Sequence, residues 1–248
     1  MDYLQKIILD IEIQSLSGIK ECFDNGLDPN TILNGRPLIY ELVNEYPRGP
    51  LFKEIVKLFI AYGLDFEDKA LLAVLADDPI VLKKVLTDQP GWIQNTYTLT
   101  CTFTPLYKAS LLHICAEYNH VEAAKILLQH GADVNVKAGL DEHGFGGQTP
   151  IFHTVNQHAN CCKEMMHWLI SQGADLQITV KGLIWGKSYE WETFIPAVNP
   201  ISYSMMGLLR QFQRKEEWIY ENTKALLQAA YGIDYTPTNL PNAYLVRG

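Results

Sequence analysis

The stretch that decides the fold is HICAEYNHVEAAKILLQHGADVN, residues 113–135. It starts with a helical pattern, breaks at Asn119-His120, continues as a second apolar helix and ends in Gly-Ala-Asp-x-Asn. Glycine suits the end of the second helix because the chain must adopt a left-handed conformation there. Residues 123–128 give that helix a broad apolar face, which is stable only when neighbours cover it. The stretch therefore predicts one helix pair of a stack.

The ending of this stretch recurs along the chain. LLQHGADVN (127–135) returns as LISQGADLQ (169–177) and, more loosely, as CFDNGLDPN (22–30), LFIAYGLDFE (58–67) and LLQAAYGID (226–234). The glycines of these endings, Gly26, Gly63, Gly131, Gly173 and Gly232, are separated by 37, 68, 42 and 59 residues. The spacing of 68 is two periods of about 34, and the other spacings fit a period of about 33 with insertions. One unit, with helices in KALLAVLADD and PIVLKKVLTD, has therefore lost its glycine.

The repeated unit resembles the ankyrin repeat, which reads T-P-L-H-x-A-A, then G-H, then L-L-L-x-x-G-A-D-x-N. SLLHICA (110–116) matches the opening, with Leu111 in place of the usual proline, and Asn119-His120 matches the G-H turn. TPIF (149–152) has Phe152 where histidine is usual. The resemblance implies an all-α repeat solenoid, an ankyrin-like stack of about six helix-turn-helix units with inter-repeat β-hairpins.

The expected boundaries follow from these matches. We expect a single ankyrin repeat domain over 1–248, with units at about 1–30, 34–67, 68–95, 105–136, 147–178 and 196–234 and a C-terminal capping tail at 235–248. A terminal unit needs such a cap because one apolar side has no neighbour. The resemblance is weakest over 69–100.

Composition narrows the classes of partner. The net charge is −8, and a nucleic-acid-binding protein would need clustered Lys and Arg to meet phosphates. The N-terminus has no signal-peptide pattern, and no apolar run reaches the roughly 18 residues of a membrane span. Five cysteines, an odd number, indicate reduced thiols. We expect a cytoplasmic monomer that has no cofactor and binds neither nucleic acid nor membrane.

The histidines admit two interpretations. His113 and His120 fall on positions whose side chains fix the turn in ankyrin units, so the resemblance implies a structural role for them. A metal-binding or hydrolytic alternative would use His153, His158, Cys161 and the carboxylate pair Glu190 and Glu192. Adjacent cysteines cannot easily place both thiolates on one metal, and no catalytic motif accompanies the pair. We expect no catalytic residue and no metal ligand.

Three insertions interrupt the repeat. The first insertion, NTYTLTCTFTPLY (95–107), favours strand, and the second insertion, KAGLDEHGFGGQTP (137–150), is a polar, glycine-rich loop. The third insertion, LQITVKGLIWGKSYEWETFIP (176–196), alternates and is rich in aromatics. A Trp- and Glu-rich hairpin of this kind makes the chain similar to a group of uncharacterised bacterial ankyrin proteins.

The third insertion predicts a hairpin over 178–195 with Gly186-Lys187 as a two-residue turn. That register places Lys181 opposite Glu192 and Trp191 over Gly182, with the aromatic side chains on one face. The aromatic face then has two possible uses. It packs onto the last unit, or it forms a finger that anchors a partner.

The expected function is a non-enzymatic protein–protein interaction module that binds through its concave face and its hairpin loops. A narrower version is an inhibitor or immunity protein of a bacterial toxin, and an alternative is a structural self-assembly module. The residues expected at the partner are Tyr40, Ile114, Glu117, Tyr118, His153, Asn156, Gln157 and Tyr203, exposed on the concave side, and Asp141, His143, Trp185, Tyr189 and Trp191 on the insertions.

Overall fold

The computed structural model describes residues 2–45, 48–206 and 214–237. Its helices are α1 (Tyr3–Glu12), α2 (Leu16–Asp24), α3 (Ile39–Asn44), α4 (Leu51–Ala61), α5 (Lys69–Leu75), α6 (Pro79–Asp88), α7 (Leu111–Tyr118), α8 (Val121–Gln129), α9 (Phe152–Val155), α10 (Lys163–Ser171), α11 (Pro200–Ser204) and α12 (Glu216–Tyr231). Short 3-10 helices lie at Pro90–Gln94 and His158–Asn160. The strands are β1 (Ile32–Leu33), β2 (Arg36–Pro37), β3 (Thr96–Leu99), β4 (Leu106–Ser110), β5 (Val180–Trp185) and β6 (Thr193–Val198).

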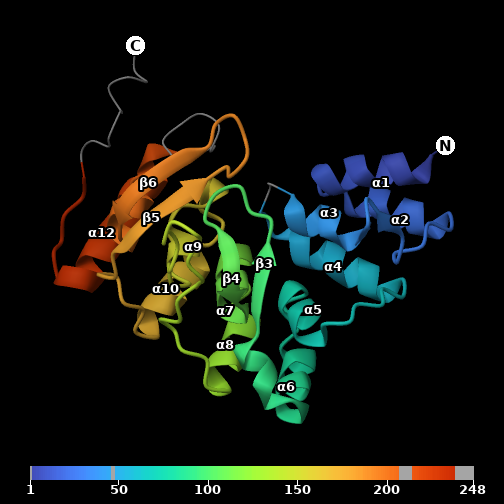
Figure 1. The fold of residues 1–248 in the computed structure, drawn as a ribbon, viewed down its shortest axis with the longest axis horizontal. Coiled ribbons are helices and arrows are strands. Elements are labelled where there is room, and N and C mark those ends of the chain that lie inside the picture. Colours follow the sequence, from blue (N-terminus) through green and yellow to red (C-terminus); the bar gives the residue numbers. More distant parts are fainter. Residues whose placement is uncertain (1, 46–47, 207–213, 238–248) are drawn as a thin grey trace.

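Helices pack as consecutive pairs, and each pair packs on the next along the chain (Figure 1). α7 lies between α5 and α9, and α8 lies between α6 and α10, so first helices stack on first helices and second on second. The strands form three separate antiparallel pairs, β1–β2, β3–β4 and β5–β6. The predicted helical repeat fold is confirmed.

The repeated glycines have one backbone conformation. Gly26, Gly63, Gly131 and Gly173 have φ of +89°, +92°, +91° and +87°, a region that other residues adopt only with strain. A Cβ at any of the four would meet no atom within 4 Å. Backbone conformation rather than crowding therefore selects glycine at these positions.

The asparagine of the Gly-x-Asp-x-Asn ending ties one unit to the next. The side chain of Asn135 donates to the Gly173 carbonyl (3.3 Å) and accepts from the Asp175 amide (2.8 Å). Asn30 makes the same two bonds, to the Gly63 carbonyl (3.0 Å) and from the Asp65 amide (2.7 Å). The interaction fixes the spacing between successive loops.

The unit without a glycine still forms both predicted helices, α5 and α6. Asp77, which follows α5, holds it to its neighbours on both sides. Its carboxylate accepts from the Ala123 amide (3.0 Å) and from the Lys53 ammonium (2.7 Å). The Asp77 side chain, in the turn between α5 and α6, therefore links this unit to both of its neighbours.

His113 and His120 are buried and hold turns together. His113 contacts Ser110 through Nδ1 (2.9 Å to Oγ) and the Gln148 carbonyl through Nε2 (2.9 Å), which joins its turn to the next pair of helices. His120 contacts the Val74 carbonyl through Nδ1 (2.7 Å), which joins its turn to the preceding pair. Their role in the described structure is the structural one.

The structure bears on two further expectations, the capping tail and the absence of a membrane span. Residues 238–248 of the expected capping tail are outside them, so nothing is said of that cap. Within the described ranges, no helix combines the length and the apolar character needed to cross a membrane.

We expect His113→Ala to lower the free energy of unfolding by about 1–3 kcal/mol, because it removes the buried contacts of the imidazole with the Ser110 hydroxyl and the Gln148 carbonyl. Urea unfolding followed by circular dichroism measures the change. His143→Ala, on an exposed side chain, is the control and should leave the midpoint in place. An unchanged midpoint for His113→Ala would contradict the structural role.

We also expect the protein to lose stability as the pH falls below about 6.5, the ordinary pKa of histidine. Burial lowers the pKa of His113 to about 3 and that of His120 to about 4. Between those values and 6.5 the unfolded chain binds protons that the folded chain does not, so acid favours unfolding. Urea midpoints at several pH values measure the slope. The slope should become shallower in His113→Gln.

Candidate partner-binding surface

The three insertions, which are far apart in sequence, pack together. The Gly186 amide of the third insertion donates to the Thr102 carbonyl of the first (2.7 Å). The Gly146 amide of the second insertion donates to the Gly182 carbonyl of the third (2.9 Å). We call the joint outer face of residues 95–107, 137–150 and 176–196 the insertion surface. The sequence showed each insertion separately but gave no sign that they meet.

Aromatic rings strengthen these junctions. Phe145 and Phe194 join the second and third insertions with their ring centroids 4.6 Å apart, and Phe103 joins the first to Trp185 of the third at 5.3 Å. β5 passes under Phe194 at Gly182, where an added Cβ would overlap the phenyl ring and displace it. The Lys181 ammonium lies 5.2 Å from the Phe145 ring centre. These contacts make the loops one packed unit.

The register predicted for the hairpin is wrong. Gly182 pairs with Pro196 and Trp185 pairs with Thr193, so residues 186–192 form a longer loop instead of a two-residue turn. The loop folds back on itself, because the Ser188 amide donates to the Glu192 carboxylate (2.9 Å) and the ring of Trp191 lies over Gly186. Lys181 is turned instead to the second insertion, where its ammonium donates to the His143 carbonyl (3.0 Å).

The three predicted aromatic residues of the hairpin separate into two groups. Trp185 is buried, and its indole N–H donates to the Tyr203 hydroxyl (2.7 Å). Tyr189 and Trp191 remain 50% and 40% exposed, with their rings stacked at 5.3 Å. Part of the aromatic face therefore packs onto the stack, and part stays available on the loop.

The prediction that the concave side exposes a row of first-helix residues is wrong. Tyr40 is half-buried, and the remaining seven are buried, namely Ile114, Glu117, Tyr118, His153, Asn156, Gln157 and Tyr203. The insertions cover part of this side, as the hydrogen bonds of the Tyr203 hydroxyl to Trp185 and to Thr104 (2.9 Å) show. Tyr118 is instead covered by Phe52 and Arg48, from the α3–α4 region. These seven side chains offer no surface to a partner in this structure.

A buried ionic cluster lies under that cover. The Glu117 carboxylate accepts from Arg48 Nε (3.3 Å) and contacts His153 Nδ1 (2.8 Å). Burial would raise the pKa of Glu117, but its bonds to His153 and Arg48 outweigh burial and lower it. Arg48 also lies over the Tyr118 ring at 4.7 Å. His153 therefore holds the buried Glu117 carboxylate in place through this contact, which accounts for the burial of both side chains.

The residues of the metal-binding or hydrolytic alternative are not gathered into such a site. Among residues 2–45, 48–206 and 214–237, no group of three or more His, Cys, Asp or Glu side chains could hold a metal ion. Cys161 Sγ lies 3.7 Å from Cys162 Sγ, whose pKa burial raises well above its usual value. Glu190 and Glu192 are on the exposed loop, where the Glu192 carboxylate accepts from the Ser188 amide.

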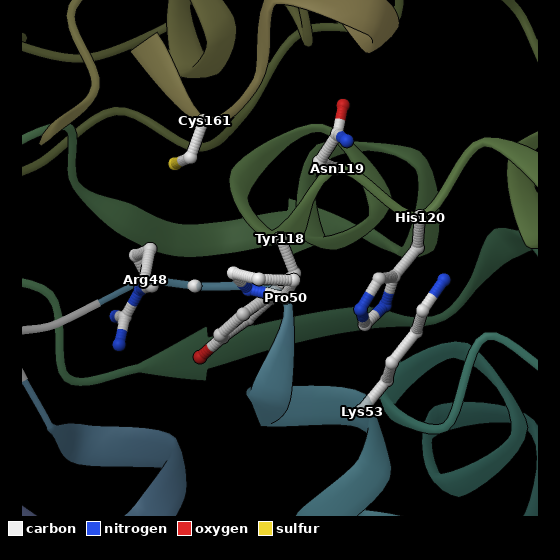
Figure 2. A pocket seen from close by; sticks show the side chains of 8 residues that line it. Arg48, Pro50, Lys53, Tyr118, Asn119, His120 and Cys161 are labelled. Carbon is white, nitrogen blue, oxygen red and sulfur yellow. The ribbon is translucent and has the colours of Figure 1, made fainter. Parts of the chain in front are cut away.

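A cavity of about 290 Å³ opens between α4 and the turn that follows α7 (Figure 2). Lys53, His120, Asn119 and Cys161 are among its lining residues. Its polar groups already have partners in the chain: Lys53 pairs with Asp77, and the Asn119 side chain accepts from the Met165 amide (3.0 Å). These polar groups therefore already have partners within the chain and do not call for a ligand.

A second cavity, of about 120 Å³, lies within the insertion surface, and all of its lining residues belong to the three insertions. They are Cys101, Pro105, Tyr107, Gly139, Asp141, Glu142, Phe145, Gly146, Gln148, Ile184 and Lys187. Each insertion also exposes large apolar side chains, namely Tyr107, Leu140, Tyr189, Trp191 and Phe194. Exposed aromatic side chains gathered around a hollow are typical of protein-binding surfaces.

A family model described as ankyrin repeats (3 copies) matches residues 23–180, from the end of α2 to the start of β5. The search of curated proteins finds no match to the chain. The matched region contains the first and second insertions and ends where the third begins to form β5.

We expect Trp185→Ala to lower the free energy of unfolding by about 3–5 kcal/mol, because it empties a packed site and removes the bond to Tyr203. Tyr189→Ala, four residues further along the exposed loop, should cost about 0.5 kcal/mol or less. Thermal and urea unfolding of both variants measure the difference. Equal losses would contradict the division of the aromatic face into a buried and an exposed part.

Proposed function

The chain belongs to the ankyrin repeat proteins, and we propose that it is a non-enzymatic protein-binding module that holds its partner with the insertion surface. Ankyrin repeats are generally protein–protein interaction modules. We further propose that the six helix pairs from α1–α2 to α11–α12 are six units of one stack. In this proposal the stack is the scaffold and the insertions choose the partner.

The observation that carries the proposal is the exposed ring stack of Tyr189 and Trp191. Backbone bonds at Gly186 and Ser188 fold the loop beneath these rings, so they are held outward at little cost in conformational entropy. Tyr and Trp are the residues most often found as anchors of protein interfaces. Of the other residues expected at the partner, Asp141 and His143 stay in the proposal because they lie on the neighbouring loop of the insertion surface. Tyr40 remains a weaker member, being half-buried on α3.

The narrower version names the partner as a toxin enzyme that the chain blocks, as an immunity protein does. The net charge of −8 supports a basic partner. The gene neighbourhood tests this version, since a toxin gene directly beside the gene for this chain is expected. Self-association through the insertion surface is the competing structural role, and light scattering over a concentration series detects it.

We expect Trp191→Ala to weaken partner binding by about 2 kcal/mol or more, roughly 30-fold, as for a central anchor. The partner is first captured from the native host and identified by mass spectrometry, and calorimetry then gives the two dissociation constants. The matched control is Ile80→Ala, which removes an 81% exposed apolar side chain from α6, outside the insertions.

The control should leave affinity unchanged, and both variants should unfold close to the wild-type midpoint. If Trp191→Ala and Ile80→Ala bind every captured partner as the wild type does, the insertion surface is not the binding site. If the wild type dimerises and Trp191→Ala does not, the self-assembly role replaces the proposal.

A further inference from the structure

Main-chain hydrogen bonds join the three insertions into one row of extended segments. β3 pairs with β4, and β4 is bonded in turn to the second insertion, whose Gly139 amide donates to the Tyr107 carbonyl (3.0 Å). The second insertion then reaches β5, because the Gly146 amide donates to the Gly182 carbonyl (2.9 Å), and β5 pairs with β6. The row therefore has two ends, β3 and β6 (Figure 1).

The two ends differ in whether a further strand can be added. Proteins commonly protect the edge of a sheet with proline, charge or a bulge, which prevent the N–H and C=O groups of the edge from pairing. In β6, Pro196 has no N–H group, and Ala197 interrupts the extended backbone with a φ of +40°. In contrast, β3 lies in NTYTLTCTFT (95–104), which has neither proline nor a charged residue. The extra residue of the β3–β4 pair lies on β4, where Lys108 has a φ of +45°.

β3 is bonded to β4 through Tyr97, which lies opposite Ala109 in the register. The residues on either side of Ala109 use their main-chain groups elsewhere. The Lys108 carbonyl accepts from the second insertion (3.2 Å), and the Ser110 amide donates to His113 Nδ1 (3.2 Å). Ala109 is therefore the residue that bonds β3 at this point, and Tyr97 turns its N–H and C=O groups toward β4.

Thr96 and Thr98 therefore turn their N–H and C=O groups to the open edge, because neighbouring residues of a strand face opposite edges. Among residues 2–45, 48–206 and 214–237, no main-chain group beyond β4 bonds either threonine. Both residues are exposed. The edge of β3 thus offers water a short row of donors and acceptors at the spacing that another extended chain would match.

The open edge leads toward the exposed ring stack of the insertion surface. Phe103, five residues after Thr98, lies with its ring centroid 5.9 Å from that of Trp191. The neighbouring Thr102 carbonyl accepts from the Gly186 amide of the loop that carries Trp191 (2.7 Å). Five residues of extended chain span at most about 18 Å, so a segment laid along β3 can continue to Trp191 within about six residues.

We propose that the open edge of β3 receives an extended segment of the protein partner, which joins the row as an added strand and continues to the anchor formed by Tyr189 and Trp191. The inference rests on the proposed function, because it names the conformation in which the partner meets the insertion surface. Main-chain bonds to β3 select an extended segment, and the anchor selects its side chains. β3 has only four residues, so a second copy pairing through this strand alone would form a short contact, whereas a partner segment also reaches the anchor.

Amide hydrogen exchange followed by NMR tests the edge in the wild-type chain. In the free chain the amides of Thr96 and Thr98 should exchange at least about tenfold faster than the amide of Tyr97, which is bonded to β4. At saturation with the captured partner, both threonine amides should slow about tenfold or more. The proposal is overturned if the three amides are equally protected in the free chain, or if the partner leaves the threonine amides unchanged.

Thr96→Pro removes one outward N–H group. Asn95 already has the extended backbone that a residue before proline adopts, with φ −63° and ψ 145°. The variant should therefore keep the wild-type unfolding midpoint and should bind the captured partner about fivefold more weakly by calorimetry. Thr96→Val, the matched control, removes the hydroxyl but keeps the N–H group and should bind as the wild type does. Equal weakening in both variants would mean that the side chain is recognised, and would overturn the proposal.

The same measurements separate this proposal from the proposed function. If Trp191→Ala weakens partner binding and Thr96→Pro does not, the added strand is wrong and the proposed function stands. If neither variant affects the partner, both fail. If the wild type dimerises in light scattering and Thr96→Pro does not, a second copy occupies the edge and the partner strand is ruled out.

Discussion

The side chain of Asn135, shared between the end of one unit and the loop of the next, is the kind of contact on which the rest of the structure depends. It donates to the Gly173 carbonyl and accepts from the Asp175 amide, and Asn30 does the same for Gly63 and Asp65. Helix pairs with such apolar faces are stable only when stacked. Two bonds from one amide hold consecutive loops at a fixed spacing, and a fixed spacing lets the next pair cover the last.

Once the stack exists, its first helices present a surface that must be either left open or covered. In this chain it is covered, in part by the insertions. Trp185 and Thr104, from two different insertions, bond the Tyr203 hydroxyl, while Arg48, from the segment after α3, lies over Tyr118. The insertions in turn carry exposed aromatic side chains and enclose a small cavity. In the proposed function, the binding surface is therefore formed by the insertions on top of the stack and not by the stack itself.

The ionic cluster beneath the insertions links segments that are distant in sequence. Glu117 on α7 meets Arg48, which follows α3, and His153 on α9. Removing one partner of a buried pair leaves an uncompensated charge and is costly, although an apolar replacement of the whole group is often neutral. The cluster therefore acts mainly to specify which segments lie together, namely the segment after α3, α7 and α9.

The sequence alone determined the periodic part of this protein. The recurring Gly-x-Asp-x-Asn ending and the matches around His113 predicted the helical repeat fold and the structural histidines, because glycine conformation, capping and helical periodicity are local properties.

The sequence did not determine which insertions meet, since Gly146 reaches Gly182 and Gly186 reaches Thr102 only after the stack has brought them together. The register of the hairpin was also decided in three dimensions. A two-residue turn at Gly186 was locally acceptable, but the packing of Trp185 on Tyr203 and the self-bonding of the loop at Glu192 favoured a longer one. The burial of Glu117 and Tyr203 was likewise decided by the tertiary structure, because a helix position faces water only if no other segment of the chain covers it.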